Sequence, residues 1–586
     1  MYKKCYSERL GKNKHLIHLW DDVEGYKRIN WLNKAYQECL PEDEEYKGLN
    51  EESLRKISKW SFSKNPKYSQ YNTEGLHFHD MKPYQKFLIE KYGVNDEPSK
   101  DHRELYFDIE IEIGGALTEE YIERAPMPVT SIAWYYRQED IWVIVILDKE
   151  NQIQYKKSNN QEIIPVENEK DLLKTFLGKF REIDPDILIS YNGDFFDIPY
   201  LYYRMCKVLG LSWANMLSPI DKVECKRGND YWFSSDTYVR IAGVESLDYL
   251  KLHKKYSWKD EPNYKLGFLG EKHVNLGKIE YTGNLDRLFQ EDIDKFIKYN
   301  FRDVEILKVM EEKLQYIALT KNISHKGKHN YSEVYYNSTT QDGAISAYLL
   351  SQGIIPPPKD PNPIVKKNYA GGYLFCSMAG LLNYMFDEDL TSLYPSILMS
   401  LNIGKETLKG RIIDSDDRNK NLGLNDLKQL EPDHVLLIEN KSRTKRAEVE
   451  AQQLIKLIEK EKWAISANGT FFRTDKKSAL SIVLNKWFEE RVYYKTKMKE
   501  AYKVGDKEKG DHYYLMQFTM KILLNSTYGA LSLKGFRYGS IILSEATTLS
   551  GQRIICESAA KANRHINKVM NNPKELENFK KELSLD

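Results

Sequence analysis

The sequence has little cysteine and no long apolar run. Its six cysteines are scattered through 586 residues without a C-x-x-C pair, which argues against a zinc site and a disulfide framework and favours a reducing compartment. The longest purely apolar run, 141–147, is far too short to span a bilayer. The start, MYKKCYSERL, lacks the apolar stretch of a secretion signal. We therefore expect a cytoplasmic protein with no membrane partner.

An excess of charge of either sign is also missing. Lysine and arginine total 87 residues against 86 aspartate and glutamate, so any surface that binds nucleic acid must be a local basic groove. Apolar residues make up 41% and charged residues 30% of the chain, as in ordinary globular proteins. The length predicts several structural units rather than one core.

Residues 104–209 carry the clearest alternation of secondary structure. We expect strands at 104–113, 129–136, 141–147 and 186–191, with helices at 169–183 and 197–209. This order predicts a layered α/β domain in which functional side chains sit at strand ends.

Four acidic residues fall at selected points of this region and of the helix that follows it. In YFDIEI, Asp108 and Glu110 are two apart and share one face of a strand, a pattern that a plain amphipathic strand explains equally well. Asp197 follows a buried strand in ISYNGDFFD, and YNFRD places Tyr299 and Asp303 on one helical face. Together the acids predict a two-metal site, in which two Mg²⁺ ions about 4 Å apart promote phosphodiester hydrolysis.

A second group of polar residues begins at FDEDLTSLYPS, residues 386–396. The apolar lead-in 380–385 predicts a buried strand that delivers Asp389 into a cleft, and the pair Tyr394–Pro395 should end that strand. Asp387 and Glu388 are extra acids beside it.

Two helices expected further along carry a polar stripe. Arg491 and Lys495 lie four apart on the helix expected at 478–502. Lys521, Asn525 and Tyr528 in MKILLNSTYG follow at i, i+4 and i+7 on the next helix. Such a stripe is costly to bury in a core. It suits a nucleotide, with the lysine on phosphate and the tyrosine against a base pair.

In this order and spacing, the motifs resemble those of family B DNA polymerases of bacteriophage type, over most of residues 75–560. The first three resemble the motifs of the proofreading 3′→5′ exonuclease, and the last two resemble the first and second polymerase motifs. The resemblance implies an α/β and α+β multidomain fold: an RNase H-like exonuclease domain, an N-terminal domain, a partial palm and α-helical fingers. A hairpin expected around Gly228 resembles one that assists strand separation in phage enzymes.

The resemblance also implies roles for single residues. Asp108, Glu110, Asp197 and Asp303 would bind two Mg²⁺ ions in the exonuclease site, with Tyr299 orienting the water. Asp389 would bind both Mg²⁺ ions of the polymerase site. The nucleotide would be bound by the backbone at Ser392 and Leu393 and by Tyr394, Arg491, Lys495, Lys521, Asn525 and Tyr528. Tyr394 would exclude a 2′-hydroxyl, and Tyr369, Gly371 and Gly372 of YAGGY would contact template DNA.

The matching domain boundaries are 1–103 (N-terminal domain, to which 336–375 returns), 104–335 (exonuclease), 376–465 (palm, first part), 466–530 (fingers) and 531–586 (palm, second part). The third polymerase motif, Y-x-D-T-D-S, is not found in the sequence. We therefore expect the N-terminal part of a split polymerase whose second polypeptide supplies that motif and the thumb. Expected partners are primer-template DNA, dNTPs, that polypeptide and, through it, a sliding clamp, in the host cytoplasm if the source is viral.

Three alternatives remain open. The chain is an incomplete product without a partner, a stand-alone 3′→5′ exonuclease with a vestigial polymerase part, or a DNA-binding subunit without turnover. The four exonuclease acids argue against the last, and the intact polar stripe argues against the vestige.

Overall fold

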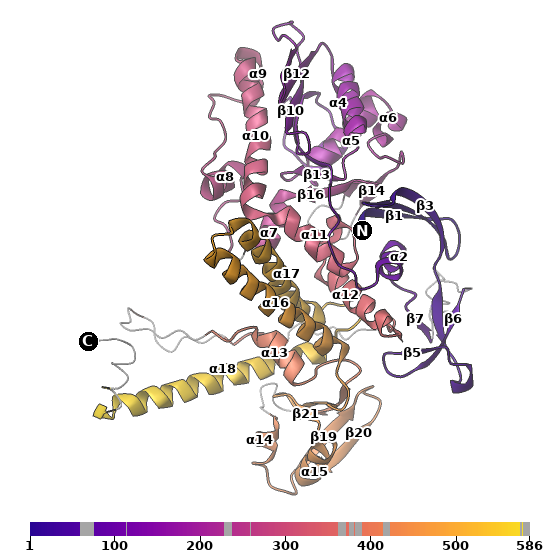
Figure 1. The fold of residues 1–586 in the computed structure, drawn as a ribbon, viewed down its shortest axis with the longest axis vertical. Helices are drawn as coiled ribbons and strands as arrows, with labels where there is room; N and C mark the ends of the chain where they lie inside the picture. The colour runs from indigo at the N-terminus through magenta and orange to yellow at the C-terminus, as the bar shows by residue number, and fades with distance from the viewer. Residues whose placement is uncertain are drawn as a thin grey trace. The chain divides into compact units, whose positions relative to one another are not determined.

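The computed structural model describes residues 1–58, 75–112, 114–227, 237–257, 259–360, 371–373, 380, 389–413, 422–574 and 577. They form two units, whose helices and strands are labelled in Figure 1. The first contains residues 1–35, 57–74 and 81–343, and the second contains 36–56, 75–80 and 344–586. Within the described ranges, no helix is both long and apolar enough to cross a membrane.

The first unit is built on a seven-stranded mixed sheet with the order β11-β12-β10-β9-β8-β13-β16. Its strands are β8 Glu104–Ile111, β9 Val129–Tyr136, β10 Ile141–Leu147, β11 Lys156–Lys157, β12 Gln161–Val166, β13 Ile187–Ser190 and β16 Glu245–Asp248. Its helices are α3 Glu119–Arg124, α4 Glu169–Ile183, α5 Asp197–Val208, α6 Leu211–Asn215, α7 Tyr249–Tyr256, α8 Leu266–Val274, α9 Leu285–Glu291, α10 Ile293–Leu314 and α11 Tyr316–Gly327. The elements expected from the sequence agree with these bounds to within two residues where the structure describes them.

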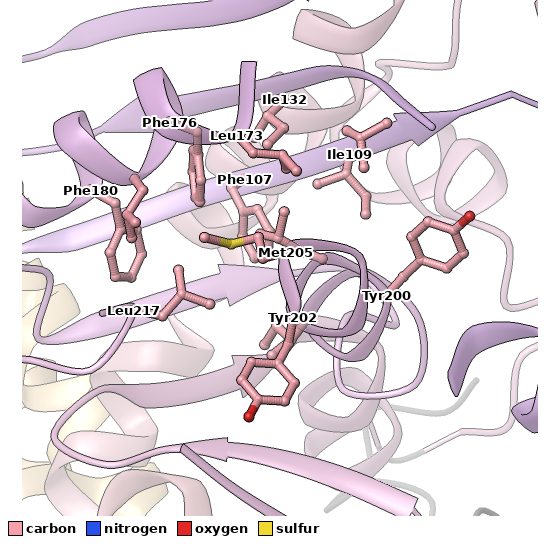
Figure 2. Close-up of a cluster of buried hydrophobic side chains, with 14 of the residues drawn as sticks. Phe107, Ile109, Ile132, Leu173, Phe176, Phe180, Tyr200, Tyr202, Met205 and Leu217 are labelled. Carbon is pink, nitrogen blue, oxygen red and sulfur yellow. The ribbon is translucent and has the colours of Figure 1, made fainter. Parts of the chain in front are cut away.

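Alternation along β8 separates the core of this unit from its polar face. Phe107 and Ile109 point into the cluster formed with Phe176 of α4 and Met205 of α5 (Figure 2). The residues between them point to the other side, where α10 packs on β8 and β9. Because side chains alternate along a strand, Asp108 and Glu110 therefore face α10.

A smaller sheet precedes this one in the chain. It consists of the antiparallel strands β1 Tyr2–Arg9, β2 Lys14–Asp21 and β3 Gly25–Leu32, and α2 Pro83–Tyr92 packs its apolar face on this sheet. The hairpin expected around Gly228 has its two strands, β14 Val223–Arg227 and β15 Thr237–Ile241, paired antiparallel. Gly228 itself lies outside the described residues.

The second unit contains two five-stranded sheets and several helices. One sheet has the order β17-β5-β6-β4-β7, with β4 Ala35–Glu38, β5 Tyr46–Gly48, β6 Ser53–Ile57, β7 Leu76–His77 and β17 Ile354–Ile355. The other has the order β20-β19-β18-β22-β21, with β18 Leu408–Ile413, β19 Val435–Asn440, β20 Arg446–Glu450, β21 Ala464–Ile465 and β22 Thr470–Phe472. The remaining helices are α12 Asn337–Ser351 (shared by both units), α13 Leu393–Ser400, α14 Leu424–Leu427, α15 Ala451–Glu461, α16 Ala479–Lys503, α17 Lys507–Leu531 and α18 Ile541–Met570. Of these helices, α16 and α17 pack against each other.

One local expectation differs from the structure. Tyr394–Pro395 do not simply end a strand, because they lie in the first turn of α13. Proline is tolerated there, since the first amides of a helix have no partner within it. Residues 381–385 of the strand expected at 380–385 lie outside the described residues, as do Asp387, Glu388 and Tyr369.

Candidate active sites

Three of the four exonuclease acids meet in the first unit. Ligand oxygens of Asp108, Glu110 and Asp303 all lie within 4.8 Å of one another. Asp197 lies at the start of α5, and its Oδ1 accepts a hydrogen bond from the amide of Ile109 at 3.2 Å. Since Ile109 lies between Asp108 and Glu110 on β8, this bond places Asp197 beside them. Gly193 makes this turn possible, since a Cβ there would come within 1.7 Å of the Ser190 hydroxyl oxygen. Elements far apart in sequence thus bring four carboxylates together.

Lys278 is a member of this site that the sequence analysis did not identify. Its Nζ lies 2.5 Å from Asp303 Oδ2 and 3.1 Å from the Tyr299 hydroxyl oxygen. It follows α8 and belongs to none of the motifs, so no sequence signal distinguished it from the other lysines. The second Asp303 oxygen, Oδ1, is buried without a hydrogen bond among the described residues.

Two further polar residues position Asp108. Asn300 donates to Asp108 Oδ2 at 2.7 Å, and Ser131 donates to the Asn300 side-chain oxygen at 2.7 Å. Asn300 directly follows Tyr299, and this adjacency to a predicted site residue was the one sequence signal for its role. Asp194, the other aspartate of ISYNGDFFD, accepts hydrogen bonds from Lys251 at 2.6 Å and from Ser246 at 2.8 Å.

The electrostatics of the cluster favour a bound cation. Burial, followed by the neighbouring acids, raises the pKa of Asp108, and burial followed by Asp303 raises the pKa of Glu110 to about 8. Burial also raises the pKa of Asp197 to about 7 and raises the pKa of Asp303. Four close carboxylates and one lysine leave negative charge uncompensated. Hard oxygen donors and the unpartnered Asp303 oxygen fit Mg²⁺.

An open cleft reaches these acids. Its volume is about 640 Å³ and its walls include Asp108, Asp303 and Lys278, together with Tyr191 and Tyr264 from two loops. The site is therefore accessible to a polymeric substrate end while its ligands stay largely shielded from solvent.

The polymerase-motif residues gather in the second unit around the start of α13. Asp389 is exposed four residues before it, and Ser392 has a left-handed backbone (φ 53°) immediately before Leu393 starts the helix. Arg491 Nη1 of α16 donates to Ser392 Oγ at 3.1 Å, while its Nε is buried without a partner in the described chain.

Positive charges of α16 and α17 converge near Ser392. Burial lowers the pKa of Arg491. Burial and then Arg491 lower the pKa of Lys521, with a smaller contribution from Lys495 and an opposing one from Asp389. Such mutual repulsion suits an anion such as a triphosphate. Lys495 and Asn525 are exposed to solvent on the same helices.

Tyr394 and Tyr528 form a stacked pair beside these cations. Their ring centroids are 4.3 Å apart at 23°. A Cβ on Gly551 of α18 would lie 3.0 Å from the Tyr394 ring, and one on Gly372 would lie 3.4 Å from its hydroxyl oxygen. The carbonyl of Gly371 accepts a hydrogen bond from Gln552 at 2.6 Å. Glycines thus enclose the Tyr394 ring, and Gly551 was not predicted.

In the described part of the chain, Asp389 belongs to no group of three or more potential metal ligands.

Two family models match this chain. The model of the family B DNA polymerase exonuclease domain matches residues 83–267, and the model of DNA polymerase family B matches residues 312–585. The chain belongs to DNA polymerase family B. Its exonuclease and polymerase domains account for the mixed α/β multidomain architecture.

Several family B relatives are similar to this chain. The DNA-directed DNA polymerase of Escherichia phage RB69 is 28% identical over 428 residues, which cover 69% of this chain and 46% of the relative. That of Enterobacteria phage T4 is 28% identical over 438 residues (69% and 47%). DNA polymerase 1 of Sulfolobus acidocaldarius is 25% identical over 464 residues (75% and 46%). The chain spans about half the length of these relatives.

Proposed function

We propose that this chain is a polypeptide of a DNA-directed DNA polymerase with 3′→5′ proofreading exonuclease activity. The observation that carries the exonuclease part is the convergence of Asp108, Glu110 and Asp303 within 4.8 Å, with Asp197 hydrogen-bonded to the same strand. Family membership supports the polymerase part. Its substrates would be primer-template DNA and dNTPs.

In the exonuclease site, the four acids would hold two Mg²⁺ ions, which supply an activated water and stabilise the leaving oxygen. Asn300 holds Asp108 in one orientation. Lys278 lies within hydrogen-bonding distance of both Tyr299 and Asp303 and so fixes the tyrosine hydroxyl beside the acids. In that position the hydroxyl can orient the attacking water, and holding a reactant in the reactive geometry lowers the activation barrier.

The test compares two aspartates of the same motif. Asp197→Asn should reduce Mg²⁺-dependent degradation of single-stranded DNA at least about 100-fold, because it removes a charge from the cluster. Asp194→Asn should retain most activity, since Asp194 is held by Ser246 and Lys251 outside the cluster. Equal loss in both variants, with both folded, would contradict the assignment.

In the polymerase site, we propose that Arg491, Lys495 and Lys521 bind the triphosphate of a dNTP and that Tyr394 packs under its sugar. Asp389 would share two Mg²⁺ ions with a second carboxylate located outside these 586 residues. One carboxylate cannot hold two ions for phosphoryl transfer, and the third family motif that carries the partner is absent from the sequence. We expect this second carboxylate on another polypeptide, which would also bind a sliding clamp.

Primer extension tests this proposal. The 586-residue chain alone should bind dNTPs and degrade DNA without extending a primer. Adding a polypeptide that contains Y-x-D-T-D-S and a thumb should restore extension, and Asp389→Ala should abolish it while leaving degradation intact. Extension by the chain alone would refute the need for an outside carboxylate.

A stand-alone exonuclease is the second candidate, favoured by the lack of a ligand group around Asp389 in the described residues. It predicts no specific dNTP binding. Saturable dNTP binding that is lost in Arg491→Ala would reject it.

A further inference from the structure

A second cluster of metal-ligand side chains lies in the first unit, apart from the four acids. It contains His253 at the end of α7, Glu261 in the loop that follows, and His273 at the end of α8. One ligand atom from each of these residues lies within 4.8 Å of the other two. The cysteine content had argued against zinc, but this set needs no cysteine.

The distances within the cluster are those of shared ligands rather than of hydrogen bonds. Glu261 Oε1 lies 3.6 Å from His253 Nε2 and 3.9 Å from His273 Nε2. A hydrogen bond between such atoms would be about 2.7–3.2 Å long. Around a tetrahedral Zn²⁺ with bonds of 2.0–2.2 Å, neighbouring ligand atoms lie roughly 3.3 Å apart. These two distances would each have to shorten by about 0.3–0.6 Å to reach that spacing.

Buried nitrogen atoms without partners also point to a missing ligand. The His253 side chain is fully buried, and neither of its ring nitrogens has a hydrogen-bond partner in the described chain. The same is true of His273 Nε2. Leaving a buried polar atom unsatisfied costs about 1–3 kcal/mol, so His253 Nε2 and His273 Nε2, which both lie beside Glu261 Oε1, call for an occupant.

The protonation state suits a metal as well. Burial, and then His273, lowers the pKa of His253, and burial lowers the pKa of His273. Neutral imidazole is the form that donates a lone pair to a metal. Glu261 keeps one oxygen for the histidines, because Lys272 pairs with the other, Oε2.

We propose that His253, Glu261 and His273 bind one Zn²⁺ ion, with a fourth position open to water. Two imidazoles and one carboxylate suit Zn²⁺ better than Mg²⁺, which prefers all-oxygen sites. This proposal does not depend on the polymerase or exonuclease assignment.

The ion would fasten one wall of the exonuclease cleft. Glu261 lies in the loop that joins α7 to α8, and its amide donates to the Tyr264 hydroxyl oxygen at 3.2 Å. Tyr264 lines the cleft that contains Asp108 and Asp303. Binding Glu261 to a histidine on each flanking helix would hold this loop in place.

Metal binding to the full 586-residue chain tests the proposal. Bound metal is first removed from the protein with a chelator, and the protein is then dialysed into excess Mg²⁺ to fill the oxygen sites. This sample is titrated with Zn²⁺ and separately with Co²⁺. We expect one equivalent of Zn²⁺ to bind and Co²⁺ to give the visible bands of a four-coordinate site. His273→Gln and Glu261→Gln should weaken Zn²⁺ binding at least about tenfold, since even changes beyond the ligands cost that much. His434→Gln, which changes an exposed histidine elsewhere, should bind like the parent.

Two outcomes would overturn the proposal: no bound Zn²⁺ in the parent chain, or full binding in a folded His273→Gln variant. A double change of Asp108→Asn with Glu110→Gln should keep the Zn²⁺ equivalent, and its loss there would place the ion among the acids instead. If the ligand variants do not fold, X-ray absorption of the Zn²⁺-loaded parent decides. Two imidazoles in the first coordination sphere support the site, and none refutes it.

Discussion

Glu110→Gln should stabilise the metal-free exonuclease domain at alkaline pH. Glu110 shares a cluster with Asp108 and Asp303, and no hydrogen bond to its carboxylate is found in the described part of the chain. Glutamine keeps the size of the side chain and removes one of the repelling charges. The substitution therefore relieves repulsion and gives up no identified contact.

The sign of the pH dependence follows from the raised pKa. In the folded, metal-free protein Glu110 holds its proton up to a pH of about 8, whereas the ordinary value is 4.5. Between these values the folded state binds a proton that the unfolded state lacks, so the free energy of unfolding falls as pH rises. Glutamine has no such loss, and its advantage should be near zero at pH 4 and largest above pH 8.

The magnitude comes from the size of the shift. A rise from 4.5 to about 8 corresponds to roughly 5 kcal/mol at most, because one pKa unit is worth about 1.36 kcal/mol. Glu110 is only partly buried, and solvent screens part of that repulsion, so we expect a gain of about 1–3 kcal/mol at pH 8.5.

Hydrogen exchange of the β8 amides is the appropriate assay, because a chain of several domains does not unfold in one step. Opening free energies are compared in EDTA at pH 5 and pH 8.5, with Glu139→Gln in the exposed β9–β10 turn as the matched control. Saturating Mg²⁺ should cancel the advantage by stabilising the parent. A variant no more stable than the parent at pH 8.5, or equally stabilised at both pH values, would refute the reasoning.

Three further predictions concern ligand binding. The pKa values of Glu110 and Asp197 are about 8 and 7, so the affinity for Mg²⁺ should fall as the pH drops from 8 to 6. For the same reason, Mg²⁺ binding at pH 7 should release protons. Calorimetry in buffers of different ionisation enthalpy measures this release. Arg491→Ala should weaken dNTP binding about 10–100-fold, the value of hydrogen bonds to a charged group. Lys486→Ala, which changes an exposed lysine on a different face of α16, should not. Tyr394→Ala should narrow the difference between dNTP and rNTP dissociation constants by about tenfold, and Tyr394→Phe should preserve it, because the ring supplies the steric clash.

The sequence predicted the exonuclease sheet well because its main strands are short apolar runs between polar segments, and their side chains share one core. Asp108 and Glu110 could be placed on one face from the period of two alone. Lys278 could not, since it joins the acids through the packing of α8 and α10 and has no fixed spacing to any of them.

For the polymerase-motif residues as well, the sequence predicted positions along a helix but not the contacts between helices. The stripe on α17 followed from helical periodicity, but the hydrogen bond from Arg491 to Ser392 and the close approach of Gly551 to Tyr394 depend on how three helices pack. The His253–Glu261–His273 cluster is the extreme case. Its spacings match no regular element, and only the folded loop brings the three together.

The two candidate active sites have opposite electrostatic defects, although the chain as a whole carries a net charge of only +1. The acids of the first unit have raised pKa values because negative charge is concentrated there. The cations of the second unit have lowered pKa values, where burial and, for Lys521, the neighbouring Arg491 disfavour positive charge. Each site is therefore strained without a ligand of opposite charge. The ligands that we propose carry that charge: metal cations in the first site and a triphosphate in the second. Near-neutral composition is thus compatible with a protein that binds strongly charged ligands, because the charges are separated between sites rather than absent.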